Sequence, residues 1–543
     1  MPGIKSWWKH GVIYQIYPRS FYDSNNDGTG DIPGIIQKLD YLSDLGITGI
    51  WLSPVNTSPM YDFGYDISNY RDIEPVFGSM TDFKLLLKEA HKRNIRIIMD
   101  LVINHTSHKH PWFIEARSSR DNHRRDWYIW HDGKNGKYPN NWMASFGGHA
   151  WQWDKTTRQY YLHTFLKEQP DVNWRNPQLK NAIFDMIRFW LDNGVDGFRL
   201  DVCNWYVKDA LFRSNPYMIG PYPRPYDMQK HIYDRNQSET LDIIREFRMV
   251  LDSYDERMSV GEVYCEQPGD PEFAVTYYGD GHDGLHEVFD FSILHGKWNA
   301  RKICESIQRW NLLVPVSGWP CHVLNNHDNP RSISRWGKKN DATEKAKVAA
   351  AMLLTLRGTP YLYYGEEIGM KDGKIPRKAM MDPLGIKYWP FHPGRDPQRT
   401  PMQWSAQANS GFSNTKPWLP INDDYPEVNV EAELADKESL LHWYKSLIAL
   451  RNENAVLQLG DWFPIIRGEN KILAYERSYD GQKVFVVLNF GTTTRKVELG
   501  GSRIWKVLQS THKSHNQEFK GLDFWLGPFE ATILKNIGPP MIT

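Results

Sequence analysis

Three carboxylates and an arginine stand at or near the ends of short apolar runs in this sequence. The runs lead to Asp201, Glu262 and Asp328, and Arg199 lies two residues before Asp201. If the runs are parallel strands of a closed barrel, their carboxyl ends meet on one face, so these side chains should converge there. Burying them together costs several kcal/mol per uncompensated charge, which argues against a purely structural role. Paired carboxylates, without a nucleophilic serine motif, a P-loop or a dinucleotide fingerprint, favour glycosidic chemistry.

The elements that would position these groups alternate along the chain. Helix-period segments at 32–45, at 81–92 and after Asn176-Pro177 separate nearly continuous apolar runs, as expected for parallel strands buried on both faces. The pattern predicts an α/β fold, a (β/α)8 TIM barrel, with a doubly wound sheet as the alternative. The eight predicted strands are 12–17, 47–52, 95–102, 197–201, 258–264, 288–294, 322–326 and 361–364.

Two breaks in this alternation divide the chain into domains. Residues 104–172 are rich in Trp, His, Gly and Asn, which predicts an inserted subdomain after strand 3. After about residue 468 only strand patterns remain, including a hairpin around Asp480-Gly481. We therefore predict a catalytic barrel at 1–103 and 173–467, the insertion at 104–172, and a C-terminal antiparallel β-sandwich at 468–543.

Composition excludes several classes of partner. The chain has 65 Lys+Arg and 65 Asp+Glu, and this balance argues against nucleic acid or an anionic membrane and favours a neutral substrate. No segment has the length of a signal peptide h-region or a membrane span. The four cysteines have no paired spacing and read as thiols of a reducing compartment, which predicts a cytoplasmic location. The 74 aromatic residues (23 Trp, 28 Tyr, 23 Phe) suit sugar stacking but also ordinary core packing.

Six motifs occur in an order that resembles the α-amylase family, glycoside hydrolase family 13. They lie at 11–21 (GVIYQIYPRSF), 100–105 (DLVINH), 197–201 (GFRLD), 261–263 (GEV), 326–328 (NHD) and 358–365 (GTPYLYYG). The resemblance implies a barrel with an inserted domain and a C-terminal β-domain. It also implies that Asp201 is the nucleophile, Glu262 the general acid and base, and Asp328 the residue that holds the sugar hydroxyls in the transition state. Arg199, on the same strand face as Asp201, is expected to hold that carboxylate ionised.

Further segments resemble the α-glucosidase and oligo-1,6-glucosidase subgroup, namely 169–174 (QPDVNW), 62–66 (DFGYD) and 395–404. On this resemblance Asp62 and Arg395 grip the outer hydroxyls of a terminal glucose, and Tyr65 stacks on it. The pocket would have a closed end, so the expected activity is a retaining, exo-acting α-glucosidase on maltose, isomaltose, sucrose and short oligosaccharides. The residues expected to bind substrate are Asp62, Tyr65, His105, Phe146, Phe165, Gln169, Arg199, Val202, His327, Arg395 and Arg399.

Val202, directly after the nucleophile, bears on the linkage. In relatives, valine at this position accompanies α-1,6 rather than α-1,4 hydrolysis, whereas Tyr264 is not the small or amide residue expected of isomaltases. One alternative is a transglucosylase or a sucrose or trehalose isomerase of the same family, which shares the chemistry until a sugar hydroxyl attacks. Another is a non-catalytic partner subunit. The expected assembly is a monomer or homodimer.

An oxygen-rich loop near the N-terminus suggests a metal site. Residues 23–31 (DSNNDGTGD) alternate oxygen-bearing side chains as an EF-hand does, but Gly34 replaces the glutamate at the twelfth position. The similar loop of α-glucosidase relatives implies one structural Ca2+ or Mg2+, held by Asp23, Asn25, Asp27, the Thr29 carbonyl and Asp31. A metal-free acidic turn is the alternative, and no organic cofactor is expected.

Overall fold

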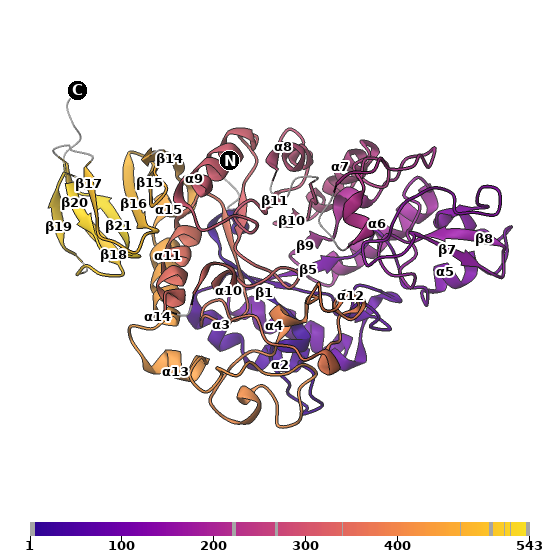
Figure 1. Ribbon diagram of the computed structural model, residues 1–543, viewed down its shortest axis with the longest axis horizontal. Coiled ribbons are helices and arrows are strands. Elements are labelled where there is room, and N and C mark those ends of the chain that lie inside the picture. The colour runs from indigo at the N-terminus through magenta and orange to yellow at the C-terminus, as the bar shows by residue number, and fades with distance from the viewer. Residues whose placement is uncertain are drawn as a thin grey trace.

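A closed barrel of eight parallel strands forms the centre of the computed structural model (Figure 1). The structure describes residues 6–219, 224–265, 270–338, 340–466, 468–498, 503–514, 516–521 and 523–538. Around the barrel the strand order is β1-β13-β12-β11-β10-β9-β5-β2, and each predicted strand is present. The strands are β1 Ile13–Ile16, β2 Gly49–Leu52, β5 Arg96–Leu101, β9 Gly197–Leu200, β10 Met258–Gly261, β11 Glu287–Asp290, β12 Cys321–Val323 and β13 Thr359–Tyr363.

The strands are buried on both faces and most of their residues are apolar, with charged side chains such as Asp100 and Arg199 buried among them, whereas the helices bury only one side. Helix α4, Met80–Lys92, places Phe83, Leu86, Leu87 and Ala90 on the barrel and begins with a capping box from Ser79 and Asp82. The predicted helix 32–45 forms two pieces, α2 Ile32–Gln37 and α3 Leu39–Leu45, because Lys38 leaves helical geometry (φ −102°, ψ 5°). The other helices are α1 Trp7–His10, α5 Pro111–Ala116, α6 Pro177–Asp192, α7 Glu239–Asp252, α8 Pro271–Ala274, α9 Ala300–Leu313, α10 Ser332–Trp336, α11 Ala342–Thr355, α12 Pro383–Tyr388, α13 Val430–Ala435, α14 Leu440–Asn452 and α15 Ala455–Leu459.

The insertion between β5 and α6 carries a small antiparallel sheet. Its strands are β6 Trp130–His131, β8 Gln159–Leu162 and β7 Trp151–Asp154, in that order, and Trp142 and Trp151 lie in its core. A buried ion pair of 2.7 Å between Lys208 and Asp171 ties the insertion to the loop after β9. A shorter hairpin, β3 Asn56–Thr57 and β4 Asn69–Ile73, follows β2. Figure 1 shows the insertion at one end of the barrel and the C-terminal domain at the other.

The C-terminal domain packs a six-stranded and a two-stranded antiparallel sheet around one apolar core. Asp480 and Gly481 both have positive φ, as a two-residue hairpin turn requires, and they join β15 to β16. The six-stranded sheet begins at β14, Asp461, ahead of the boundary predicted at 468. The proline at 464 conceals this strand in the sequence, and edge strands such as β14 tolerate proline. The strands are β14 Asp461–Ile466, β15 Ile472–Tyr479, β16 Gln482–Asn489, β17 Arg495–Glu498, β18 Ile504–Ser510, β19 Glu518–Lys520, β20 Asp523–Leu526 and β21 Ala531–Asn536.

Two features of the described chain bear on the other predictions. None of its helices combines the length and apolarity that crossing a bilayer requires. Cys203, Cys265 and Cys321 carry thiols, not disulfides. The outer ends of the predicted domains, 1–5 and 539–543, lie outside the described residues.

Candidate active site

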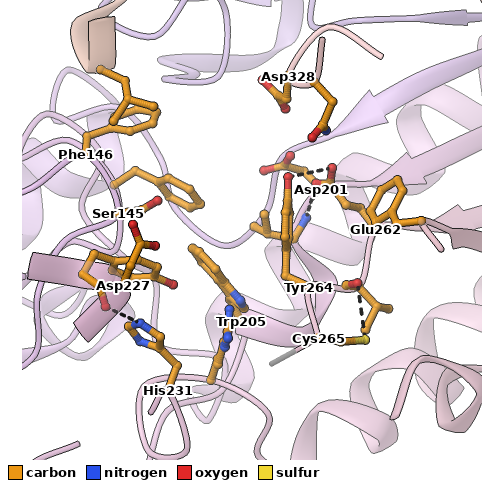
Figure 2. Close-up of a pocket in the computed structure, with 18 of the residues that line it drawn as sticks. Ser145, Phe146, Asp201, Trp205, Asp227, His231, Glu262, Tyr264, Cys265 and Asp328 are labelled. Atoms are coloured by element: carbon orange, nitrogen blue, oxygen red, sulfur yellow. Dashed lines mark hydrogen bonds between the residues drawn. The ribbon is translucent and has the colours of Figure 1, made fainter. Parts of the chain in front are cut away.

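The three predicted catalytic carboxylates face one cavity of about 490 Å³ at the carboxyl end of the barrel. Asp201 directly follows β9, Glu262 directly follows β10, and Asp328 lies beyond β12. Backbone hydrogen bonds from Glu262 N to Leu200 O and from Cys203 N to Glu262 O, both 3.0 Å, join the two neighbouring loops. Figure 2 shows Asp201, Glu262 and Asp328 pointing into the same space.

One guanidinium holds both members of the proposed nucleophile and acid pair. Arg199, which is fully buried, places Nη1 2.7 Å from Asp201 Oδ1 and 2.7 Å from Asp100 Oδ1. Its Nη2 lies 2.6 Å from Glu262 Oε2. Because Asp201 and Glu262 bind neighbouring nitrogens of one planar group, the arrangement fixes their separation and relative orientation.

Burial is the largest influence on the pKa of both Glu262 and Asp201. It raises the pKa of Glu262 to about 7, against the opposing charge of Arg199, so the carboxyl can start a reaction as an acid at neutral pH. Burial also raises the pKa of Asp201, which Arg199 opposes. The expectation that Arg199 simply keeps Asp201 ionised is therefore incomplete, because this arginine is shared among three carboxylates. Burial thus favours a proton on this pair, and Glu262, the predicted general acid, is the member expected to hold it.

Asp328 is held as a carboxylate. Burial opposes its ionisation, but the neighbouring His327 and the guanidiniums of Arg395 and Arg399 outweigh that effect and lower its pKa below the ordinary value. Arg399 Nη2 lies 2.7 Å and Arg395 Nη1 3.3 Å from Asp328 Oδ1. Asp328 can thus accept hydrogen bonds from sugar hydroxyls without giving up its charge.

An ion-pair network lines part of the cavity. Arg395 Nη2 lies 2.7 Å from Asp62 Oδ1 and 2.7 Å from Asp382 Oδ1, so Asp62 and Arg395 form a pair while both line the cavity. Asp382 is fully buried and was not anticipated from the sequence. Tyr65 lies beside this network, where its hydroxyl donates to Asp100 Oδ2 at 3.0 Å.

The predicted substrate-binding residues fall into two layers. The first layer lines the cavity, and the second lies behind it and contacts the first. Gln169 Nε2, for example, donates to Asp62 Oδ2 at 3.2 Å, and His327 Nε2 lies 2.6 Å from the Tyr65 hydroxyl. Burial lowers the pKa of His105 to about 4, so its ring is a neutral hydrogen-bonding group. The first layer is Asp62, Tyr65, His105, Phe146, Phe165, Val202 and Arg395. The second layer is Gln169, Arg199, His327 and Arg399.

An aromatic wall opposite the carboxylates was largely missed from the sequence. Trp205 stacks on Phe165, with ring centroids 4.9 Å apart, and lies 5.9 Å from Tyr264 and 6.2 Å from Tyr226. Figure 2 shows Trp205 and Tyr264 side by side. Trp205 lies four positions after the nucleophile and ends the three-residue 3-10 helix Cys203–Trp205. This helix is too short for periodicity to mark it, so only the high aromatic content was a signal.

Val202 has strained backbone geometry beside the nucleophile. Its φ of 39° and ψ of 46° lie in the left-handed region, which β-branched residues rarely adopt. Such strain costs on the order of 1–3 kcal/mol and typically persists where the surrounding structure or function demands it. The side chain joins the aromatic wall, with Trp205 and Tyr226.

Comparison with known proteins identifies the family. A family model of the α-amylase catalytic domain matches residues 15–460. The chain belongs to the α-amylase family. It is 41% identical to an oligo-1,6-glucosidase of Parageobacillus thermoglucosidasius, an alignment that covers 97% of this chain and 99% of that one.

Solved structures of family members share the whole fold. An α-glucosyl transfer enzyme, XgtA, superposes with a TM-score of 0.90 at 38% identity, covering 98% of this chain and 99% of that one. The trehalulose synthase MutB of Pseudomonas mesoacidophila MX-45 gives a TM-score of 0.90 at 34% identity, covering 98% and 100%. The family, the barrel fold and the assignment as a glycoside hydrolase are thereby confirmed, and the non-catalytic alternative is excluded by the complete set of carboxylates and these relatives.

The predicted metal loop lies apart from the carboxylates and is organised by its own hydrogen bonds. Asp23 accepts from the backbone of Asn26 and Gly28, both at 2.8 Å, and Asp27 accepts from Thr29 N at 2.8 Å. Asp31 caps helix α2 by accepting from Gly34 N at 2.6 Å. Within the described residues, no group of three or more His, Cys, Asp or Glu converges as metal ligands. A cation here would depend on Asp23, Asn25, Asp27 and the Thr29 carbonyl, and would compete with these internal hydrogen bonds.

Proposed function

We propose that this protein is a retaining, exo-acting α-glucosidase that uses Asp201 and Glu262 in a double displacement. The observation that carries the proposal is the single Arg199 guanidinium that binds both carboxylates. Sharing one guanidinium is compatible with the separation of about 5–5.5 Å typical of retaining enzymes. It is harder to reconcile with the roughly 6.5–9.5 Å of inverting enzymes, which must seat a water between the acid and base.

The proposed reaction has two steps. Asp201 attacks the anomeric carbon while Glu262 gives its proton to the glycosidic oxygen, so the bond to the leaving group breaks with its electron pair on that oxygen. Glu262, now a carboxylate, takes a proton from water as the water oxygen displaces Asp201. Asp328 is ionised and can stabilise the developing positive charge on the sugar ring.

A closed end at this network would support exo-action on short substrates. The Arg395, Asp62 and Asp382 network leaves charged hydrogen-bonding groups where the outer hydroxyls of a terminal glucose would sit. A chain entering from the open side can place only its non-reducing glucose between this network and Asp201.

The linkage is proposed to be mainly α-1,6. Support comes from Val202 beside the nucleophile and from the similarity to an oligo-1,6-glucosidase. Isomaltose-type sugars are therefore the preferred substrates, ahead of maltose and sucrose. Tyr264 distinguishes this chain from the pattern expected of isomaltases.

Transfer or isomerisation is the second candidate, and the aromatic wall favours it. Trp205, Tyr226 and Tyr264 present apolar faces that can hold a sugar or other acceptor after the first step. The similar XgtA is named a glucosyl transfer enzyme, and MutB a trehalulose synthase. In either case the first step is unchanged and a hydroxyl replaces water in the second.

The remaining proposals concern a bound metal ion, the cellular location and the oligomeric state. One Ca2+ or Mg2+ at the loop 23–31 would join this loop to the segment around Ser413, whose hydroxyl already donates to Asp23 at 2.6 Å. We also propose a cytoplasmic location and a monomer or homodimer.

Product analysis tests the function. Isomaltose, maltose, sucrose and trehalose would be incubated with the enzyme, and products followed by chromatography and early proton NMR. The proposal predicts α-glucose as the first product and isomaltose as the best disaccharide. β-Glucose as the first product would overturn retention, and disaccharide isomers exceeding free glucose would favour the second candidate.

A further inference from the structure

The two oxygens of the Glu262 carboxyl have different surroundings. Oε2 lies 2.6 Å from Arg199 Nη2 in an ion pair, and it accepts a hydrogen bond from the backbone N–H of Val202 at 3.3 Å. Oε1 receives a hydrogen bond from the Tyr264 hydroxyl at 3.2 Å, the one hydrogen bond to this atom from the described part of the chain. Because the cationic guanidinium and this N–H both face Oε2, the proton of the neutral acid belongs on Oε1, beside Tyr264.

The backbone of Tyr264 is fixed by a side-chain clamp. Asn204 Oδ1 accepts from Tyr264 N at 3.0 Å, and Asn204 Nδ2 donates to the Tyr264 carbonyl at 2.8 Å. The same Nδ2 donates to Asn236 Oδ1 at 2.6 Å, and Asn236 N donates to the Asn204 carbonyl at 2.8 Å. Asn204 is completely buried and lies just after the nucleophile. The clamp therefore ties Tyr264 to the loop that carries Asp201.

The ring of Tyr264 is packed on the cavity side. It lies 5.9 Å from Trp205 and 6.1 Å from Phe291, and all three residues line the cavity. These aromatic neighbours restrict the ring and so hold its hydroxyl near Oε1. Figure 2 shows this ring standing next to Glu262.

We propose that Tyr264, held by Asn204, is a positioning residue that orients Glu262 and stabilises the carboxylate formed when Oε1 delivers its proton. This inference rests on the proposed function, because it takes Glu262 as the acid and base. In the first step the Oε1–H bond breaks, the proton goes to the glycosidic oxygen, and the electron pair stays on Oε1. The Tyr264 hydroxyl keeps its own proton and donates to that oxygen. In the second step Oε1 takes a proton from water while Tyr264 holds it towards the anomeric carbon.

The charged groups around Glu262 set the pKa on which loss of the Tyr264 hydroxyl acts. Arg199 favours the carboxylate, whereas the nearby carboxylates of Asp328 and Asp100 disfavour it. Asp201 shares Arg199 with Glu262, and the Cys203 thiol donates to the Glu262 carbonyl at 3.3 Å. Tyr264 adds a donor to the ionised form, so its removal raises the pKa of Glu262.

The test is the pH profile of Tyr264→Phe, which removes only the hydroxyl. We expect the basic limb of kcat/KM on isomaltose to move up by about one pH unit, the scale of one hydrogen bond to a charged group. With 4-nitrophenyl α-glucoside, whose leaving group needs little acid, kcat should fall about tenfold, because the base step then limits turnover. Tyr254→Phe is the matched control, since its hydroxyl binds Asp192 on the outer surface. Its profile should equal that of the wild type.

A second variant tests the clamp that holds Tyr264 and leaves the Tyr264 hydroxyl in place. Asn204→Ser leaves Tyr264 in place but shortens the clamp, and it should move the basic limb in the same direction while the folded state still melts cooperatively. An active wild-type enzyme with Tyr264→Phe matching it at every pH would overturn the inference and leave the proposed function intact. A wild-type enzyme that cleaves none of the α-glucosides would instead refute the proposed function.

Discussion

Replacing Glu262 by glutamine removes its acidic proton and tests the general-acid role apart from the size of the side chain. Glutamine keeps the volume, and its carbonyl oxygen can still accept from Val202 N, the donor now at Oε2. It cannot deliver a proton, and it loses the 2.6 Å ion pair with Arg199. Arg199 keeps Asp100 and Asp201 as partners, so the guanidinium does not become an unpaired buried charge. The fold is expected to survive.

The size of the effect depends on the leaving group. Loss of a general acid typically costs about 10²–10⁴-fold, or roughly 2.7–5.5 kcal/mol of barrier. Isomaltose, whose leaving group is an alcohol, should show the whole loss in kcat/KM. 4-Nitrophenyl α-glucoside needs little acid in the first step, so its kcat/KM should fall less than about tenfold, while kcat falls because no base activates water.

Stopped-flow release of 4-nitrophenol measures both steps. Glu262→Gln should give a burst close to one equivalent followed by slow turnover, and azide, which needs no base, should restore turnover and give α-glucosyl azide. Equal losses on isomaltose and the aryl glucoside, with no burst, would refute the assignment of Glu262 as acid and base.

Four further outcomes follow from the same geometry. Because Glu262 must be protonated and its pKa is raised by burial to about 7, kcat/KM on isomaltose should be full below about pH 7 and decline as pH rises through it; a profile flat to pH 9 would contradict this. Asp201→Asn should reduce kcat at least about 10⁴-fold, as residual activity would show. Its melting temperature, measured by calorimetry, should equal or exceed that of the wild type, because the substitution removes a carboxylate whose ionised form is disfavoured by burial. Val202→Thr keeps a β-branched residue at the strained φ of 39°, so strain is matched, and the isomaltose to maltose ratio of kcat/KM should fall on the order of tenfold; an unchanged ratio would remove the linkage proposal. Millimolar Ca2+ added after EDTA treatment should raise the melting temperature by about 2–5 °C, and Asp27→Ala should abolish that rise; the same rise in this variant would place the cation elsewhere.

The barrel and its catalytic carboxylates were predictable from the sequence because both leave local signals. The buried strands are mostly apolar, and Asp201 and Glu262 immediately follow two of them. Gly261 before Glu262 is part of the same signal, since a Cβ there would lie 2.3 Å from Leu285 Cδ1. The local sequence therefore indicated which carboxylates lie at the ends of the barrel strands.

Features that depend on contacts distant in sequence could not be predicted. The ion-pair network around Arg395 also includes Asp382, and nothing near Asp382 in the sequence indicates its buried partner. The two layers around the sugar site could not be separated either, because a motif gives residue identity but not which side chain reaches the cavity. Strand β14 was missed because Pro464 breaks the pattern that marks a strand.

The most direct test of the proposed double displacement is to trap the covalent glucosyl-enzyme. The wild-type protein would be incubated with 5-fluoro-α-D-glucosyl fluoride, digested, and analysed by mass spectrometry. We predict one equivalent of label, attached to the peptide that contains Asp201 and absent from Asp201→Asn. Label on a different carboxylate, or turnover with inversion and no covalent adduct, would contradict it.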